Sequence, residues 1–373
     1  MAKMPARLEA KINLDAIVEN WKTLNARSGQ AMASAVVKAD GYGHGMIMVA
    51  RALAHAGCDL FFTASLDEAM TLRAALPLSQ IGYFDGFDIH DHDEVINHRL
   101  MPTIADFDQL QRLDHLARNQ GKAIPALLHI DTGMNRIGFS ERDAPALFDH
   151  DEFAAGDWKM IYSHLASADA PQDAMNEKQQ SAFDRLLSHP SVKGIPASLA
   201  ATAGILLGDA FHYNITRPGL GLYGLTPNQP SLIDLKPALA LYGRVLQIRD
   251  AEAGETVGYG ASETLTRRSR LATIGGGYGD GVNRLLSSKG QVMKDGLTAR
   301  MIGRVSMDVH VVDITDWPEN HLTTGDAVTL LGDGLSVHDW ANISQTIPYE
   351  MLTTLGLRAK RHYAGAVLSH LGA

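Results

Sequence analysis

Short apolar runs alternate with longer amphipathic stretches through the first two-thirds of the chain. Each run is bounded by Gly, Pro, Asp or Ser, as is typical of buried parallel strands. The runs cover residues 34–40, 59–65, 80–86, 101–106, 125–131, 159–165, 196–202 and 213–219. The amphipathic stretches predict helices over residues 15–26, 46–56, 66–75, 107–119 and 177–188. Eight strand–helix units at this regular spacing predict an α/β fold, a (β/α)8 TIM-type barrel, rather than an open doubly wound sheet.

The pattern changes near residue 235, and the remainder of the chain predicts an all-β module. Segments 238–250, 267–279, 297–315 and 326–334 are rich in Val, Ile, Thr and Leu and are separated by Gly-containing turns. Two short helices are predicted over residues 337–345 and 349–355. We therefore expect two domains, a barrel over residues 1–235 and a mostly β domain over residues 236–373.

The composition is that of a folded protein and argues against several classes of function. The chain has 373 residues, of which 45% are hydrophobic and 20% charged, which excludes a largely disordered protein. The net charge of −9 argues against nucleic-acid binding, which needs clustered Lys and Arg. No apolar run reaches the length of a membrane-spanning helix. The first residues lack the apolar core of a signal peptide, and Cys58 is the only cysteine, so we expect a cytoplasmic protein.

A barrel of this type carries its chemistry at the carboxyl ends of its strands. Lys38 ends the first strand, after a buried run and before a Gly-rich turn that contains Tyr42. A lysine that is removed from water has a lowered pKa and can act as a Schiff-base nucleophile. Arg136 follows the fifth strand in a turn with two glycines, which suits contact with an anion. These strand ends are the first candidates for a functional site.

The last three strands of the predicted barrel also end in polar groups. The sixth ends with His164, and the eighth carries Arg217 followed by Pro, Gly219 and Leu220. The seventh ends at Thr202, beside a predicted helix start, which is a natural site for a phosphate group.

Three other patterns have simpler explanations than a ligand site. The glycines of residues 219–224 have dinucleotide-binding spacing, but no helix clearly follows them. The glycine-rich run 275–281 lacks the Lys-Ser/Thr pair of a phosphate loop. Residues 90–94, His-Asp-His-Asp-Glu, fit the solvated start of a helix better than a set of metal ligands. We therefore expect no metal site.

Eight motifs, in order along nearly the whole chain, resemble those of the alanine racemase family, which uses pyridoxal 5'-phosphate (PLP). They are AVVKADGYGHG (35–45), DTGMNRIGF (131–139), YSHLASAD (162–169), RPGLGLYG (217–224), VGYGASET (257–264), GGGYGDG (275–281), GRVSMD (303–308) and IPYEM (347–351). The resemblance implies a barrel followed by a β domain, PLP as cofactor, and a homodimer with shared active sites. It implies interconversion of L- and D-alanine, either to supply D-alanine for peptidoglycan or in alanine breakdown.

The resemblance also implies roles for individual residues. Lys38 would carry PLP and act as one catalytic base, and Tyr259 of the β domain would act as the other from a partner subunit. Arg217 would face the pyridine nitrogen, with His164 linking it to Tyr259. The cofactor-binding residues would be Lys38, Tyr42, Arg136, His164, Thr202, Arg217, Gly219, Leu220 and Tyr349. The substrate would contact Arg136, Met307, Tyr278 and Tyr349, with Asp169 and Ile347 also at the entrance.

Three positions depart from the usual family motifs, and one alternative stays open. His129 stands where many members have a lysine that braces the strand-end arginine, and a protonated histidine there would repel Arg136. Ala201-Thr202 replaces a common Asn-Ser, and Ser306 replaces a frequent cysteine. The open alternative is a racemase of another or broader set of amino acids such as serine. A PLP-binding carrier protein would lack the β domain, and a decarboxylase would favour an acidic group where Arg217 stands.

Overall fold

The computed structural model describes residues 6–226, 233–332 and 334–371, and the chain divides into two compact units. The barrel unit contains Asp15–Gly41 and Met46–Lys236, and the β unit contains Tyr42–Gly45 and Pro237–Ala366. The β unit also contains the first strand, β1 (Leu8–Asn13). The long barrel segment ends at Lys236, next to the domain boundary that we expect at residue 235. However, β1 and Tyr42–Gly45 belong to the β unit although they precede residue 235 in the sequence. No helix in the described ranges is long and apolar enough to cross a bilayer.

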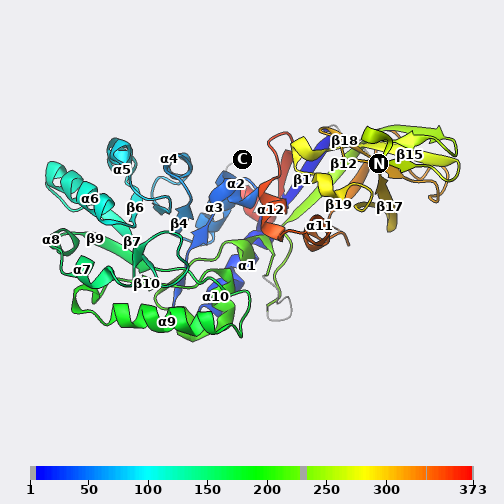
Figure 1. Ribbon diagram of the computed structural model, residues 1–373. Coiled ribbons are helices and arrows are strands. Elements are labelled where there is room, and N and C mark those ends of the chain that lie inside the picture. The colour runs from blue at the N-terminus through cyan, green and yellow to red at the C-terminus, as the bar shows by residue number, and fades with distance from the viewer. Residues whose placement is uncertain (1–5, 227–232, 333, 372–373) are drawn as a thin grey trace. The chain divides into compact units, whose positions relative to one another are not determined.

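Parallel strands alternating with helices form the barrel unit (Figure 1). Seven strands pair in the order β10-β9-β7-β6-β5-β4-β3, and β8 pairs with β7 off this path. Together with the separate pair of β2 and β11, the strands of the barrel unit have the following bounds: β2 (Met32–Ala33), β3 (Ala35–Val36), β4 (Leu60–Thr63), β5 (Gln80–Tyr83), β6 (Met101–Ile104), β7 (Pro125–Asp131), β8 (Phe139–Ser140), β9 (Asp157–Tyr162), β10 (Ala197–Ser198) and β11 (Ile215–Thr216).

Strand β11 occupies the eighth position of the ring. It pairs in parallel with β2 on one side, and Ser34 N, between β2 and β3, donates to Thr216 O at 2.9 Å. On its other side, Asn214 N donates to Ala197 O at 3.0 Å and Arg217 N donates to Ala200 O at 2.9 Å. The bonds therefore run from β10 through β11 back to the first strand segment, and the predicted barrel fold is confirmed.

The helices of the barrel unit are α1 (Leu14–Arg27), α2 (Lys38–Tyr42), α3 (Met46–His55), α4 (Leu66–Ala75), α5 (His92–His98), α6 (Phe107–Gln120), α7 (Ala144–Phe148), α8 (Asp151–Ala154), α9 (Ala174–Leu187) and α10 (Thr202–Leu207), with the short 3-10 turns η1 (Ile89–Asp91), η2 (Pro190–Val192), η3 (Asp209–Phe211) and η4 (Leu220–Tyr223). Five of these helices, α1, α3, α4, α6 and α9, agree with the predicted amphipathic stretches to within a few residues, and no such stretch was predicted for the others. All four residues of β4 and of β6 are buried, as expected for strands covered on both faces.

A mostly antiparallel sheet forms the β unit, in the order β15-β18-β17-β16-β19-β12-β1-β20. Its strands are β12 (Leu239–Ala251), β15 (Ser269–Gly275), β16 (Gln291–Lys294), β17 (Leu297–Ile302), β18 (Val309–Asp313), β19 (Ala327–Leu331) and β20 (Lys360–Ala364), with a separate hairpin of β13 (Thr256–Val257) and β14 (Glu263–Thr264). The predicted segment 297–315 is two strands, because Gly303 turns the chain with a φ of 68° after β17.

Strand β1 belongs to this sheet because both of its edges are paired there. It lies antiparallel to β12, with Leu8 opposite Gly243, and parallel to β20, with Glu9 opposite Lys360. The remaining helices are α11 (Val337–Ser344) and α12 (Pro348–Thr353), close to their predicted positions, with turns η5 (Tyr259–Ala261), η6 (Tyr278–Asp280) and η7 (Arg284–Leu286), and a last turn η8 (Ala366–His370). The core joins sheet residues to Trp340 of α11.

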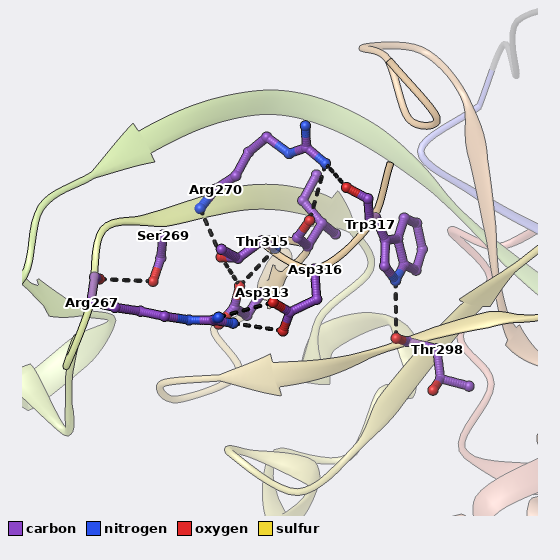
Figure 2. A network of polar contacts seen from close by, with 9 residues as sticks. Arg267, Ser269, Arg270, Thr298, Asp313, Thr315, Asp316 and Trp317 are labelled. Atoms are coloured by element: carbon purple, nitrogen blue, oxygen red, sulfur yellow. Dashed lines mark hydrogen bonds and ion pairs between the residues drawn. The ribbon is translucent and has the colours of Figure 1, made fainter. Parts of the chain in front are cut away.

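A polar network fixes the chain where β18 ends (Figure 2). Arg267 donates to both carboxylate oxygens of Asp316, at 2.9 and 2.6 Å. Arg270 donates to the carbonyl of Trp317 at 2.6 Å, and the Trp317 indole nitrogen donates to Thr298 O at 3.0 Å. These contacts join β15, β17 and the segment after β18.

Candidate functional site

Lys38 stands at the carboxyl end of the first barrel strand, at the start of an unusual turn. Ala39, Asp40 and Gly41 all have left-handed backbone angles, with φ of 53°, 51° and 62°. Non-glycine residues rarely adopt this conformation, so the turn needs support from its neighbours. Ala39 N donates to Glu68 Oε1 at 2.7 Å, and Gly41 N donates to Val37 O at 2.9 Å. The support fixes the direction in which the lysine leaves the strand.

The pKa of Lys38 is lowered, first by burial and then by the positive charge of Arg136. Glu68 and Asp85 act in the opposite direction. A lysine with a lowered pKa has a larger neutral fraction near pH 7, and only the neutral amine is a nucleophile or a base. The sequence prediction for Lys38 thus has a physical basis in the fold.

Arg217 is a fully buried cation at the end of the eighth strand. It is 3% exposed. It donates to Ser198 Oγ, to Ser163 O at 2.6 Å and to Leu199 O at 3.4 Å. Its guanidinium also lies 5.0 Å from the ring centre of Tyr162. Burial lowers the pKa of Arg217 to about 10, so the group keeps its charge near neutral pH, held by carbonyl and hydroxyl oxygens.

Two histidines near Arg217 are neutral. Burial and the charge of Arg217 lower the pKa of His129 to about 3, and burial with Arg217 and Arg136 does the same for His164. The His129 ring stacks on Tyr162 at 4.4 Å with an interplanar angle of 9°. The repulsion of Arg136 that a protonated His129 would cause is therefore absent near neutral pH. Among the described residues, no direct hydrogen bond joins the side chains of His164 and Arg217.

The ends of the seventh and eighth strands are joined by the Thr202 hydroxyl. Thr202 is 3% exposed, and its Oγ1 accepts hydrogen bonds from Gly219 N and Gly221 N, both at 3.1 Å. The amide of Gly219 is thus already bonded within the protein. Leu220, the next predicted contact, is buried and begins η4.

Arg136 is carried by a loop that one carboxylate holds. Asp131 Oδ1 accepts from Gly133 N at 2.7 Å and Met134 N at 2.8 Å, and its Oδ2 accepts from Arg136 N at 3.0 Å. The Arg136 side chain is exposed and borders a recess that His129 and His164 also line. Arg136 thus lies close enough to lower the pKa of Lys38, and the charges of Arg217, Arg136 and Lys38 lie close enough to lower the pKa of His164.

Five further predicted residues belong to the β unit: Tyr42, Tyr259, Tyr278, Met307 and Tyr349. The ring centres of Tyr42 and Tyr349 lie 6.5 Å apart. Gly43 allows this approach, because a Cβ there would lie 2.1 Å from Leu352 O in α12. Tyr259, Tyr278 and Met307 are 71%, 44% and 54% exposed. These three side chains are therefore accessible to a ligand or to a second chain.

Family models match nearly the whole chain. The model described as "Alanine racemase, N-terminal domain" matches residues 12–227, and "Alanine racemase, C-terminal domain" matches residues 238–363. The chain belongs to the alanine racemase family.

Individual relatives agree with this assignment. A biosynthetic alanine racemase of Agrobacterium fabrum is 38% identical, over 96% of this chain and 94% of its own length. A catabolic alanine racemase of Mesorhizobium japonicum is 39% identical, over 95% of this chain and 92% of its own. The crystal structure of alanine racemase from Bartonella henselae, with covalently bound pyridoxal phosphate, aligns with a TM-score of 0.91 at 36% identity, covering 96% and 100% of the two chains. The resemblance seen in the sequence is confirmed.

The residues present fit the cofactor of the alanine racemase family. Lys38 offers an amine with a lowered pKa. Arg217 is a buried donor, which matches an unprotonated pyridine nitrogen, an acceptor. The Thr202 oxygen accepts two amide protons, which leaves its own proton free to donate to a phosphate oxygen.

Several residues that support this site were not found from the sequence. They are Glu68, Asp131, Ser198 and Gln179. Gln179 is fully buried, and its amide donates to His164 O at 2.9 Å while its Oε1 accepts from Ala166 N at 2.8 Å. The DTGMNRIGF motif begins with Asp131, which was the one available signal.

Proposed function

We propose that the protein is a PLP-dependent alanine racemase that interconverts L- and D-alanine with two bases, Lys38 and Tyr259. The observation that carries the proposal is the cluster of Lys38, Arg136 and Arg217 at the strand ends of the barrel, where burial and the charge of Arg136 lower the pKa of Lys38. The family match supports the reaction type and the cofactor. PLP, when bound, supplies an electron-withdrawing ring that makes the α-proton of an amino acid removable.

The barrel residues hold and orient the cofactor in this proposal. Lys38 Nζ would form the covalent link to PLP, Thr202 Oγ1 and the loop of Gly219 and Leu220 would bind its phosphate, and Arg217 would donate to its pyridine nitrogen. Because Arg217 stays protonated, it opposes protonation of that nitrogen. Tyr42 and Tyr349, whose rings lie near each other, would also contact the phosphate.

Inversion of the α-carbon requires proton transfer on both of its faces. Inversion needs one group to take a proton from the α-carbon on one face and another to return a proton on the opposite face. Lys38 Nζ takes or returns the proton on one face of the α-carbon, and Tyr259 Oη does so on the opposite face. Arg136 and the Met307 amide bind the substrate carboxylate, and Tyr278 and Tyr349 restrict the space for its side chain. Because His164 is neutral, it adds no charge to the site. The positive electrostatic potential around Lys38 and His164 therefore comes from Arg217 and Arg136.

We propose that two copies of the chain form a homodimer in which each Tyr259 serves the other copy's Lys38. The exposure of Tyr259 supports this arrangement, because a catalytic tyrosine open to solvent within its own chain needs a second surface to exclude water. Mixing Lys38→Ala and Tyr259→Phe variants should restore part of the activity. Proven mixed dimers without any activity would refute the shared site.

The second candidate is a racemase that also accepts serine, because a pocket for alanine rejects one added hydroxyl only weakly. A racemisation screen of all amino acids with the PLP-loaded protein separates the candidates. The proposal expects alanine to have the highest kcat/KM. No turnover of alanine would refute the proposed function, and a higher kcat/KM for serine would favour the alternative. Both biosynthetic and catabolic relatives match the chain, so either physiological role is compatible.

A further inference from the structure

Two loops of the β unit carry Tyr278 and Met307, and they lie directly against each other. Tyr278 N donates to Ser306 O and Gly279 N donates to Met307 O, both at 3.0 Å. A Cβ on Gly277 would lie 2.2 Å from Ser306 O, so no side chain fits between the loops there. The position of the Tyr278 loop therefore depends on the position of the Met307 loop.

Arg358, which lies between α12 and β20, joins both loops from outside. Its Nε lies 2.8 Å from Asp280 Oδ1, and Asp280 is buried and accepts from Gly277 N at 3.0 Å through its other oxygen. Its Nη1 donates to Asp308 Oδ1 at 2.7 Å, and its Nη2 donates to Met307 O at 3.4 Å. One guanidinium thus contacts the residue after Gly279 and the residue after Met307.

The geometry suits arginine better than lysine. The planar guanidinium presents donors in fixed directions, so it bonds two carboxylates and a carbonyl at once, whereas an ammonium is a single point of charge. An additional Cβ on Gly279 would lie 2.6 Å from Arg358 Nη2, so the guanidinium is also packed against the backbone beside Tyr278. The arrangement holds the backbone of the two loops, from which the exposed side chains of Tyr278 and Met307 project, in a fixed relation.

We propose that Arg358 is a positioning residue for the substrate, which acts by fixing the loops of Tyr278 and Met307 relative to each other. This inference rests on the proposed function, in which both loops contact the substrate. Because Arg358 acts on substrate contacts and not on the barrel residues that hold PLP, its loss should weaken substrate binding more than cofactor binding.

The test is the steady-state kinetics of Arg358→Ala and Arg358→Lys for L- and D-alanine, with the PLP content measured by absorbance. We expect Arg358→Ala to raise KM about tenfold for both enantiomers, with kcat changed less and full PLP content, since it removes two charge-assisted bonds that solvent partly screens. Arg358→Lys should recover part of the lost affinity, because lysine replaces one of the two contacts.

Arg267→Ala is the matched control. It removes an arginine with the same kind of carboxylate pair, to Asp316 (Figure 2), in the same unit but without contact to either loop. It should leave KM unchanged. An unchanged KM in Arg358→Ala, or an equal KM in both arginine-to-alanine variants, would overturn the positioning role. If Arg358→Ala does not fold, Asp308→Ala is the second variant, because it removes the half-exposed carboxylate that Arg358 Nη1 contacts. It should raise KM about threefold. An unchanged KM in Asp308→Ala would also overturn the positioning role.

The failure of this inference is distinguishable from failure of the proposed function. An unmodified protein that does not racemise alanine refutes the function. An unmodified protein that racemises alanine, together with variants of unchanged KM, refutes the role of Arg358 alone.

Discussion

Replacing Thr202 by valine should separate two effects of its hydroxyl group. Valine has nearly the same shape as threonine but no oxygen. The substitution therefore leaves Gly219 N and Gly221 N, each 3.1 Å from Thr202 Oγ1, without an acceptor inside the barrel. It also removes the hydroxyl proton proposed to bind the phosphate of PLP.

The size of the effect follows from these contacts. A buried donor left unpaired costs about 1–3 kcal/mol, so two of them should lower the free energy of unfolding of the apoprotein by about 2–6 kcal/mol. The matched variant, Thr202→Ser, keeps the acceptor and loses one methyl group, which costs about 1 kcal/mol. For PLP, loss of one charge-assisted bond to phosphate should weaken binding by about 10- to 100-fold in the valine variant only.

The assay combines urea unfolding of the apoproteins with PLP titration followed by absorbance. The expected order of stability is unmodified protein, then Thr202→Ser, then Thr202→Val. The PLP affinity should fall in Thr202→Val alone and stay near that of the unmodified protein in Thr202→Ser. If the valine and serine variants match in both measurements, the hydroxyl neither joins the strand ends nor binds the phosphate. If they differ only in stability, Thr202 is structural and the phosphate contact is wrong.

Two further predictions concern titration and covalent attachment. The unfolded chain takes up a proton on His129 below about pH 6.5, whereas the folded chain, where its pKa is about 3, does not until about pH 3. The free energy of unfolding should thus rise with pH in this window, and His129→Phe, which keeps a ring on Tyr162, should reduce the slope by up to about 1.4 kcal/mol per pH unit; equal slopes in urea titrations would contradict the neutral state. Borohydride reduction of the PLP-loaded protein should leave a stable adduct on Lys38 in peptide mass spectrometry, and an adduct on another lysine would refute that role.

The strands of the barrel were predictable because each is a short apolar run buried on both faces and closed by a turn residue. The placement of β1 was not. Its partners, β12 and β20, follow more than two hundred residues later in the chain, and no local pattern distinguishes it from a barrel strand. A single boundary drawn along the sequence cannot represent a unit that takes up three separate segments of the chain.

Some residues of the candidate site were also predictable from the sequence, and others were not. Lys38, Arg136 and Arg217 stand at strand ends, where the barrel fold itself directs attention. Ser198 and Gln179 support Arg217 and His164 through contacts between elements distant in sequence, which only the folded chain reveals. The neutrality of His129 likewise depends on burial and on neighbouring arginines, so the sequence motif alone suggested a repulsion that the fold removes.

The most direct test of the two-base account is exchange of the α-proton in D2O, measured separately from L- and D-alanine with Tyr259→Phe. The account predicts that the variant keeps its PLP and loses exchange from one enantiomer, while Lys38 still exchanges the proton of the other. Equal loss of exchange from both enantiomers, with PLP retained, would contradict the claim that Lys38 and Tyr259 act on opposite faces.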